Sequence, residues 1–331
     1  MIKWFDFPDV RFIVNGLAWF EEEKPSVRRL PVRLKGTFRE SLWDLAQNPA
    51  GGRIRFRTNA LKIGIKTLSP DNAVMHHITL IGTAGFDIYA DDTYFGSTWP
   101  GSAGKNETEW IVGNKRKMRD ITIHLPIYKN VEIKQIGVEK DATIKSPTPF
   151  AIKKPVVFYG TSITQGGCAS NPGGSYQAFL SRSLNLDFIN LGFSSNGMGE
   201  PEMAHAICEI DSSFIILDHW ANIRLGLKEN LPVFTGVIRK KFPKTPIAVV
   251  SPFFYSSVPA ERENSRIRKD AEEFVRQRRR EGDCNIHLID GLKLLSQKES
   301  YGLVDGVHCN TLGFYFIARG MEPYFKKILS L

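Results

Sequence analysis

The chain has 331 residues, of which 42% are hydrophobic and 24% are charged, and it carries a formal net charge of +9. This length suggests about two domains, and the composition is that of a globular protein that can bury a core without disulfide staples. The positive charge favours anionic partners, but much of the arginine lies in one segment, 262–280, where acids are mixed with bases. Such mixed charge is typical of an exposed helix, and no zinc-finger, RNA-binding or basic-zipper motif accompanies it. We therefore expect no nucleic-acid partner.

The four cysteines are widely spaced and form no CxxC pair, which argues against a zinc ribbon or a thioredoxin motif. They are Cys168, Cys208, Cys284 and Cys309. Their small number suits a reducing compartment, and the first residues, MIKWFDFPDV, lack the apolar run of a signal peptide. Apolar residues nowhere continue for the roughly 18 positions of a membrane span. We expect a cytoplasmic protein with no membrane span, no metal and no cofactor.

The first half of the chain contains short runs in which polar and apolar residues alternate, as in half-buried antiparallel strands. In the run 52–60, arginines alternate with Ile54 and Phe56, which predicts one apolar face and one charged face. Turn residues recur about every ten positions, a pattern typical of a β-sandwich or jelly roll. Further strands are expected at 61–68, 76–92 and 118–126, and one helix at 39–47. We predict a β-rich domain at 1–145.

The pattern changes near residue 142. The segment 142–155 is rich in Pro, Thr and Lys and is typical of a linker. Beyond it, near-continuous apolar runs alternate with helical patterns, which predicts a parallel sheet covered on both faces by helices. Strands are expected at 156–160, 187–192, 213–218, 246–252 and 285–290, and helices at 174–185, 200–209, 224–241, 259–281 and 311–329. We predict a second domain at 150–331.

The stretch KPVVFYGTSITQGGCAS, residues 154–170, runs from a predicted buried strand straight into Gly160, Thr161 and Ser162. In open α/β sheets, ligands bind beyond the carboxyl ends of the strands, which is where this serine lies. Three interpretations compete. A phosphate-binding loop would require the pattern GxxxxGK[ST], which this stretch does not contain. A structural turn is the simplest alternative, and a nucleophilic serine requires a base, a group that orients the base and donors for an oxyanion.

Residues that could serve as these partners follow other predicted strands. Asp305 and His308 stand three positions apart just before the last helix, so the carboxylate can hold the imidazole that takes the serine proton. Gly192 follows the second strand, where its backbone N–H can face a site, and Asn222 follows the third, where its amide can donate to an oxyanion. Each of these has an ordinary structural explanation by itself. Their joint occurrence at strand ends favours the nucleophile.

This order of serine, glycine, asparagine and DxxH resembles the sequence blocks of the SGNH hydrolase superfamily, also called GDSL-like esterases. The resemblance covers the second predicted domain and implies a flavodoxin-like three-layer α/β/α fold with a parallel sheet. It implies that Ser162 is the nucleophile, His308 the base and Asp305 the carboxylate behind it. The oxyanion hole would consist of the Ser162 N–H, the Gly192 N–H and the Asn222 side chain.

Two departures from the commonest pattern fit one branch of the superfamily. Thr161 stands where the GDS block has aspartate, and Asn222 stands four residues after Asp218 instead of in a contiguous GxND. The stretch YGTSITQGGCASNPG, residues 159–173, is similar to the GDSL-like lipase/acylhydrolase branch that has an N-terminal GxDLY domain. GFDIY at 85–89 matches that signature, with isoleucine for leucine. The resemblance implies that the first domain is a β-sandwich, or jelly roll, like that of two-domain SGNH esterases.

Two other features are weaker candidates. His76 and His77 are adjacent, and adjacent residues on the expected strand point to opposite faces, so they cannot easily share a metal ion. Cys309 could suggest a thiol nucleophile beside His308, but we expect it to point away from its neighbour.

The resemblance implies a serine esterase that cleaves short-chain esters, above all acetyl esters on carbohydrate, through an acyl-enzyme. Trp99, Trp110 and Tyr94 could stack on sugar rings or could lie in the sandwich core. An acyltransferase that uses the same acyl-enzyme and a non-catalytic carbohydrate-binding protein are the alternatives. The expected partner is a small-molecule or carbohydrate ester, and a homo-oligomer is left open.

Overall fold

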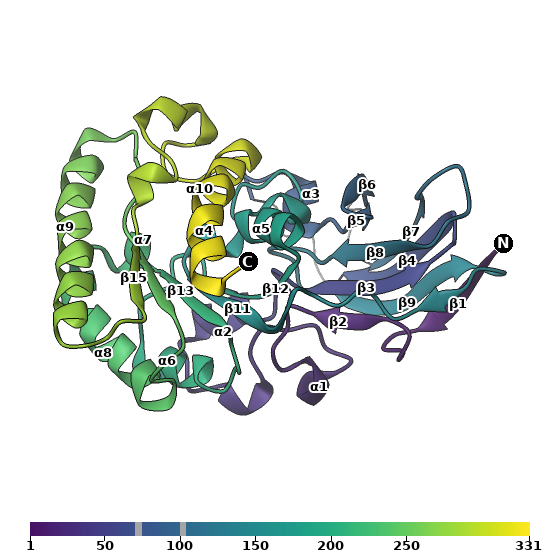
Figure 1. The fold of residues 1–331 in the computed structure, drawn as a ribbon. Helices are drawn as coiled ribbons and strands as arrows, with labels where there is room; N and C mark the ends of the chain where they lie inside the picture. Colours follow the sequence, from purple (N-terminus) through teal and green to yellow (C-terminus); the bar gives the residue numbers. More distant parts are fainter. Residues whose placement is uncertain (70–74, 100–103) are drawn as a thin grey trace. The chain divides into compact units, whose positions relative to one another are not determined.

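The computed structural model describes residues 1–69, 75–99 and 104–331. The chain divides into two compact units (Figure 1). The N-terminal unit comprises Met1–Phe150 together with Ser170–Gly173, and the C-terminal unit comprises Ala151–Ala169 and Gly174–Leu331. The sequence predicts one change of domain near residue 150, and no pattern in it indicates that Ser170–Gly173 groups with the first unit.

Two antiparallel sheets form the N-terminal unit. The first sheet has the order β1 (Ile2–Asp6), β9 (Glu132–Glu139), β4 (Lys62–Ser69) and β7 (Gly104–Ile111). The second has the order β10 (Ile144–Lys145), β3 (Arg53–Thr58), β8 (Arg119–His124), β5 (Asp87–Ala90) and β6 (Thr93–Ser97), and β2 (Ile13–Asn15) also pairs with β3. Ile54 and Phe56 of the second sheet share one buried cluster with Ile63 and Ile136 of the first. The predicted β-sandwich is confirmed.

Ile54 and Phe56 of β3 lie in the core as the alternation predicts, but two of the three arginines of this strand are buried as well. Arg53 is 1% exposed and Arg55 is 8% exposed. The guanidinium of Arg55 lies over the ring of Phe150, 3.8 Å from its centroid, and donates to the carbonyl oxygen of Thr148 at 2.7 Å. The prolyl and aromatic segment after β10 therefore covers the charged face of this strand, which no pattern within the strand could reveal.

The helices of the N-terminal unit are α1 (Phe20–Glu23), α2 (Glu40–Ala46) and α3 (Leu80–Ala84). The expected helix at 39–47 is present, but the strand expected at 76–92 is found only as β5, since α3 occupies the part before it. Thr79 caps this helix by accepting the N–H of Gly82 on its side chain at 2.9 Å. His76 and His77 lie in the turn before α3 with ring centroids 4.8 Å apart, so the opposite-face argument for these histidines does not apply.

The C-terminal unit contains one parallel sheet with the order β12-β11-β13-β14-β15, which is the flavodoxin-like order 2-1-3-4-5. Its strands are β11 (Ile152–Gly160), β12 (Leu186–Gly192), β13 (Phe214–Asp218), β14 (Ile247–Val250) and β15 (Ile286–Ile289). Gly160, at the end of β11, pairs in register with Gly192 of β12 and with Asp218 of β13. The carboxyl ends of the first three strands therefore lie on one line.

Helices cover both faces of this sheet (Figure 1). They are α4 (Ser162–Gln165), α5 (Tyr176–Leu184), α6 (Pro201–Ile207), α7 (Trp220–Ile223), α8 (Leu227–Lys241), α9 (Val258–Arg280) and α10 (Thr311–Leu329). Phe158 of β11 packs against Tyr176 of α5 and Phe325 of α10, with centroids 5.6 and 6.0 Å away. The next residue, Tyr159, stacks on Phe234 of α8 at 4.9 Å. Adjacent strand residues thus reach opposite helical layers, and the three-layer α/β/α fold is confirmed.

The arginine-rich helix α9 is only partly exposed. It buries an apolar stripe that includes Ile267, Ala271 and Phe274, and the charged residues occupy its other faces. Among the described residues, no helix is both long enough and apolar enough to cross a bilayer.

One buried ion pair joins α8 to the sheet. Arg239 donates from Nε to Asp283 at 2.7 Å and from its two other nitrogens to the carbonyl oxygens of Phe242, Thr245 and Asn285. The side chains of Arg239 and Asp283 are only 10% and 7% exposed. A buried carboxylate that loses its partner is costly, so this pair holds the end of α8 against the loops before β14 and β15.

We expect Arg239→Ala to lower the free energy of unfolding of the C-terminal unit by about 3–5 kcal/mol, because the buried Asp283 would lose its main counter-charge and keep only the longer contact with Arg278, at 3.3 Å. Urea unfolding followed by tryptophan fluorescence measures this loss. Arg276→Ala removes the exposed partner of Glu273 and serves as the control, with an expected change within about 0.5 kcal/mol. An equal effect of the two substitutions would contradict the assignment.

Candidate active site

Ser162 lies at the first position of α4, directly after the strand β11. Thr161 caps the helix with a capping box, and Gly166 ends it in the left-handed conformation with φ of 108°. The helix therefore has a single turn, and its first residue stands at the carboxyl end of the sheet. Ser162 is 8% exposed, so it is largely shielded but not sealed off from solvent.

Close backbone packing requires glycine at two positions beside this turn. A Cβ built on Gly160 would lie 2.0 Å from Oγ1 of Thr164, and one on Gly192 would lie 2.2 Å from the backbone nitrogen of Gln165. Both distances are far below any van der Waals contact, so a side chain at either position would push α4 away from the strands. This crowding explains why the buried strand before Ser162 ends on a glycine.

His308 and Asp305 meet Ser162 through two hydrogen bonds. The hydroxyl oxygen of Ser162 lies 2.9 Å from Nε2 of His308, and Nδ1 of the same ring lies 2.8 Å from Oδ2 of Asp305. Oδ1 of Asp305 accepts the backbone N–H groups of Val307 at 3.0 Å and His308 at 2.8 Å. The carboxylate thus shapes the loop that presents the imidazole as well as bonding to the ring.

The charge state of Asp305 suits this arrangement. Partial burial by itself would raise its pKa, but the backbone N–H and ring of His308 and the N–H of Val307 outweigh burial and lower the pKa to about 2. Asp305 is therefore a carboxylate at neutral pH. It favours the imidazole tautomer with hydrogen on Nδ1, which leaves Nε2 free to accept the hydroxyl proton of Ser162.

A second carboxyl group, that of Asp218, lies buried at the end of β13. Its Oδ2 accepts from Oγ1 of Thr164 at 3.2 Å and from the hydroxyl of Tyr176 at 3.0 Å, and its Oδ1 accepts from Nε1 of Trp220 at 3.0 Å. Burial raises its pKa to about 7, and these three donors oppose the rise. Asp218 therefore joins α4, α5 and α7 to the strand end, and its hydrogen bonds go to these elements rather than to the imidazole of the candidate site.

Two of the hydrogen-bond donors expected from the sequence are not taken by another described residue. The backbone N–H of Ser162, in the first turn of α4, makes no hydrogen bond to any described residue. Asn222 lies in the one-turn helix α7, and its Oδ1 accepts the N–H of Gly197 at 3.0 Å. That bond fixes the orientation of the amide and leaves Nδ2 as a donor.

Gly192 does not offer the donor that the sequence suggested. Its N–H donates to Oδ1 of Asn190 at 2.8 Å, so the group is already satisfied. In the following loop, the N–H groups of Phe193, Ser194, Asn196 and Gly197 also have acceptors. The backbone N–H of Ser195, by contrast, has no acceptor among the described residues.

Ser195 has the backbone conformation of a glycine, with φ of 56°, and it is exposed. Non-glycine residues adopt this left-handed conformation rarely. Ser195 is thus a candidate donor that the sequence did not reveal. No residue-type signal marked it, because serine carries no preference for positive φ.

The structure argues against some of the thiol and aromatic candidates that the sequence suggested and keeps others. Burial raises the pKa of Cys309 well above its ordinary value, so a thiolate nucleophile is disfavoured there. Trp110 is 5% exposed and belongs to the sandwich core, which excludes it from sugar stacking. Trp99 and Tyr94 are 85% and 49% exposed and stay available for it.

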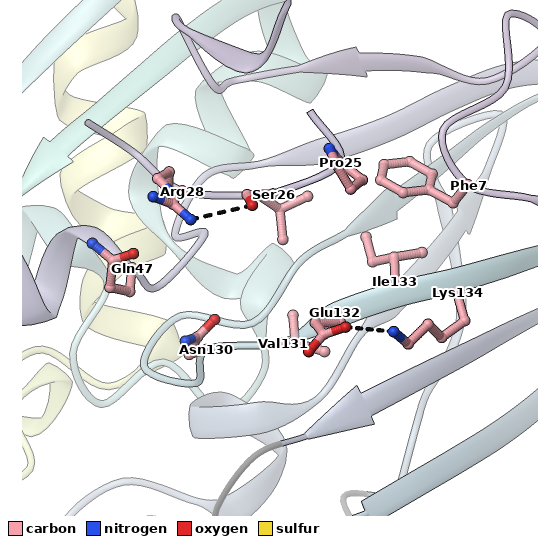
Figure 2. Close-up of a pocket in the computed structure, with 11 residues that line it drawn as sticks. Phe7, Pro25, Ser26, Arg28, Gln47, Asn130, Val131, Glu132, Ile133 and Lys134 are labelled. Atoms are coloured by element: carbon pink, nitrogen blue, oxygen red, sulfur yellow. Dashed lines mark hydrogen bonds and ion pairs between the residues drawn. The ribbon is translucent and has the colours of Figure 1, made fainter. Parts of the chain in front are cut away.

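A separate hollow of about 340 Å³ lies within the N-terminal unit (Figure 2). Phe7, Val131 and Ile133 supply apolar surface, and Arg28 lies at its edge with a hydrogen bond of 3.2 Å to Ser26. All eleven residues that line it come from the N-terminal unit. None of the candidate site residues contributes to it.

Comparisons with known proteins agree with this geometry. Residues 153–326 match the GDSL-like lipase/acylhydrolase family, and residues 2–144 match the N-terminal domain of SGNH-hydrolase-type esterases known by the GxDLY signature. No curated protein sequence gives a significant match.

Solved structures resemble the chain over most or all of its length. A protein of Bacteroides ovatus, described as a GDSL-like lipase, is 30% identical with a TM-score of 0.89, and the match covers 100% of this chain and 98% of the other. A salicylyl-acyltransferase from a tetracycline biosynthetic pathway is 18% identical with a TM-score of 0.84, covering 100% and 98%. An acetyl xylan esterase of Butyrivibrio proteoclasticus is 10% identical with a TM-score of 0.61, covering 85% and 91%. The last two show the fold alone, but the first, with the family match, shows that this chain belongs to the GDSL-like lipase/acylhydrolase family of ester-hydrolysing SGNH enzymes.

Proposed function

We propose that the chain is a serine esterase in which Ser162 attacks the carbonyl carbon of a short acyl ester. The observation that carries this proposal is the chain of hydrogen bonds from the Ser162 hydroxyl through His308 to Asp305, at 2.9 and 2.8 Å. A nucleophile, a base and an orienting carboxylate within hydrogen-bond reach are the arrangement that acyl transfer to serine requires.

The reaction proceeds in two halves. Nε2 of His308 takes the hydroxyl proton while the oxygen of Ser162 bonds to the carbonyl carbon, and the carbonyl oxygen becomes an oxyanion. The imidazolium then gives its proton to the leaving alcohol, and the acyl group stays on the serine. Water attacks the acyl-enzyme with His308 again as base, and the carboxylic acid leaves. Asp305 remains ionised throughout and stabilises the imidazolium.

The oxyanion is stabilised by donors that the protein leaves unpaired. We assign the N–H of Ser162, the Nδ2 of Asn222 and the N–H of Ser195 to this role, in place of the satisfied N–H of Gly192. Donors that are already oriented cost no reorganisation when the charge develops, which is why they lower the barrier.

The acyl group we propose is acetyl, carried on a carbohydrate. The support is the fold shared with an acetyl xylan esterase and the two exposed aromatic residues Trp99 and Tyr94, a residue type that stacks on sugar rings. Acetate release from acetylated sugars, compared with release of acids from longer-chain esters and phospholipids, tests the choice. A preference for phospholipid would overturn it.

An acyltransferase is the second candidate, since the fold matches a salicylyl-acyltransferase with a higher TM-score, 0.84, than the acetyl xylan esterase, 0.61. The same acyl-enzyme would then pass its acyl group to an alcohol instead of water. Product analysis in the presence of acceptor alcohols separates the two: acyl transfer that competes with acid release favours the transferase.

We expect Ser162→Ala to abolish turnover of p-nitrophenyl acetate, with a loss on the order of 10⁶ in kcat as for a removed nucleophile. Ser183→Ala, at a serine of α5 whose hydroxyl bonds to the carbonyl oxygen of Leu180, is the matched control and should keep the wild-type rate. Undiminished turnover by the Ser162 variant would reject the proposal.

Asn222→Ala should lower kcat by roughly 10²–10³ with a much smaller effect on KM, because an oxyanion donor acts mainly in the transition state. Asn59→Ala is the control, since Asn59 likewise accepts one backbone N–H on its side chain, that of Thr143 at 2.8 Å. A change confined to KM would show that Asn222 contacts the substrate in its ground state instead.

Asp305→Asn should lower kcat by about 10⁴, since the amide would keep the loop hydrogen bonds but present Nδ2 to the ring and favour the wrong imidazole tautomer. Asp305 has a pKa of about 2, so its own protonation should contribute nothing to the pH dependence of kcat/KM above about pH 4. Asp187→Asn, at the amino end of β12, is the control and should keep the wild-type rate. An equal loss of rate in the two variants would contradict this assignment.

A further inference from the structure

The motif GFDIY, residues 85–89, has no part in the site described above, yet three of its residues have specific positions. Gly85 ends α3: its N–H donates to the carbonyl oxygen of Ile81 at 2.8 Å, and a Cβ would come within 2.5 Å of that oxygen. Asp87 and Tyr89 follow on β5 and are both buried, with exposures of 0% and 7%. Because the two residues are two positions apart on a strand, their side chains point to the same face.

Asp87 holds the segment Ser170–Gly173. Its Oδ2 accepts from Nδ2 of Asn171 at 2.7 Å and from the backbone N–H of Gly173 at 2.6 Å. Its Oδ1 accepts from the hydroxyl of Ser97 at 2.5 Å, and that hydroxyl lies 2.8 Å from the hydroxyl of Tyr94. Hydrogen bonds to a buried carboxylate are among the strongest in proteins, so this is a firm attachment.

Two further contacts fix the same segment. The hydroxyl of Thr79, the cap of α3, donates to the carbonyl oxygen of Ser170 at 2.7 Å. A Cβ on Gly173 would lie 2.5 Å from the hydroxyl oxygen of Tyr89, so only glycine fits against that ring. The aspartate and the tyrosine of the motif therefore both contact these four residues, and the glycine ends the helix whose cap, Thr79, binds Ser170.

Within the chain, this segment stands in the connection from the Ser162 helix to α5. The N–H of Gly167 donates to the carbonyl oxygen of Ser162 at 2.8 Å, and the N–H of Ala169 donates to that of Gly166 at 3.1 Å. The chain is thus tightly hydrogen-bonded from Ser162 as far as Ala169, which is fully buried. The next residue, Ser170, begins the segment that Asp87 holds, so the hydrogen-bonded stretch after Ser162 leads directly into this segment.

We propose that Asp87 is a positioning residue for Ser162: by fixing Ser170–Gly173 it fixes the end of the connection that carries the nucleophile helix. The inference rests on the proposed function of Ser162. The bonds that Asp87 accepts from Asn171 and Gly173 reach a segment outside the strands of the sandwich, whereas the bond from Ser97 joins β5 to β6.

Four full-length variants test this role. Asp87→Ala leaves the N–H of Gly173 and the amide of Asn171 without their acceptor. Asp87→Asn keeps the shape, and its amide oxygen can still accept from both groups while the Ser97 hydroxyl turns to accept from the new NH₂. Asn171→Ala removes one bond from a half-buried loop residue and should fold normally. Glu139→Ala is the control: it removes an acceptor of the backbone N–H of Leu61 elsewhere in the N-terminal unit.

Hydrogen exchange gives the readout that does not depend on activity. In Asp87→Ala, amides of 170–173 should exchange about tenfold faster or more, and the faster exchange should extend back through 162–169. Turnover of p-nitrophenyl acetate and labelling of Ser162 by a fluorophosphonate should slow together by about 10–100-fold, with KM within about threefold, because a small displacement of a reacting atom is costly. Asn171→Ala should show the same pattern more weakly, and Asp87→Asn should recover most of the rate.

Faster exchange confined to 170–173, or an equal loss of rate in Glu139→Ala, would overturn the positioning role and leave a general effect on stability. If the wild type shows no ester turnover and no labelling of Ser162, the proposed function fails instead. The exchange pattern at 162–169 then still decides whether Asp87 holds the helix.

Discussion

Glycines set how closely the backbone packs at the carboxyl edge of the parallel sheet. A Cβ on Gly160 would meet Thr164 at 2.0 Å, one on Gly192 would meet a backbone nitrogen of α4 at 2.2 Å, and one on Gly197 would meet the carbonyl oxygen of Gly160 at 2.3 Å. Without this packing, α4 could not begin at the strand end, and the loop with Gly197 could not reach Asn222. The nucleophile, the proposed oxyanion donors and the imidazole loop all take their places relative to this crowded edge.

Two carboxyl groups of the C-terminal unit show how the surroundings of a side chain set its pKa. Asp305 accepts two backbone N–H groups and the imidazole, and its pKa falls to about 2, so it is charged whenever the enzyme works. Asp218 lies deep beneath α4 among hydroxyl and indole donors, and burial raises its pKa to about 7. Solvation and the number of N–H donors, rather than residue type, give the two carboxyl groups such different pKa values, and the ionised one is the member of the proposed triad.

Periodicity and spacing sufficed for the architecture and for the encounter of Ser162 with His308 and Asp305, because parallel strands bring their carboxyl ends to one edge whatever lies between them. These patterns did not predict features in which a side chain takes a backbone hydrogen bond or in which a distant segment covers one face of a strand. The amide of Asn190 takes the N–H of Gly192, the positive φ of Ser195 has no signature in its residue type, and Phe150 covers Arg55. Such features depend on tertiary neighbours, which a period-two or period-3.6 pattern does not contain.

The grouping of Ser170–Gly173 with the first unit has a consequence for biosynthesis. A ribosome releases the chain from its N-terminus onward, and domains commonly fold as they emerge. Here the sandwich would emerge with the carboxylate of Asp87 still lacking the donors of Asn171 and Gly173, until the residues that follow the linker had also cleared the exit tunnel. A fragment that stops at the linker would lack these donors permanently. The smallest fragment in which the β-rich unit is complete therefore extends beyond the boundary between the two sequence patterns.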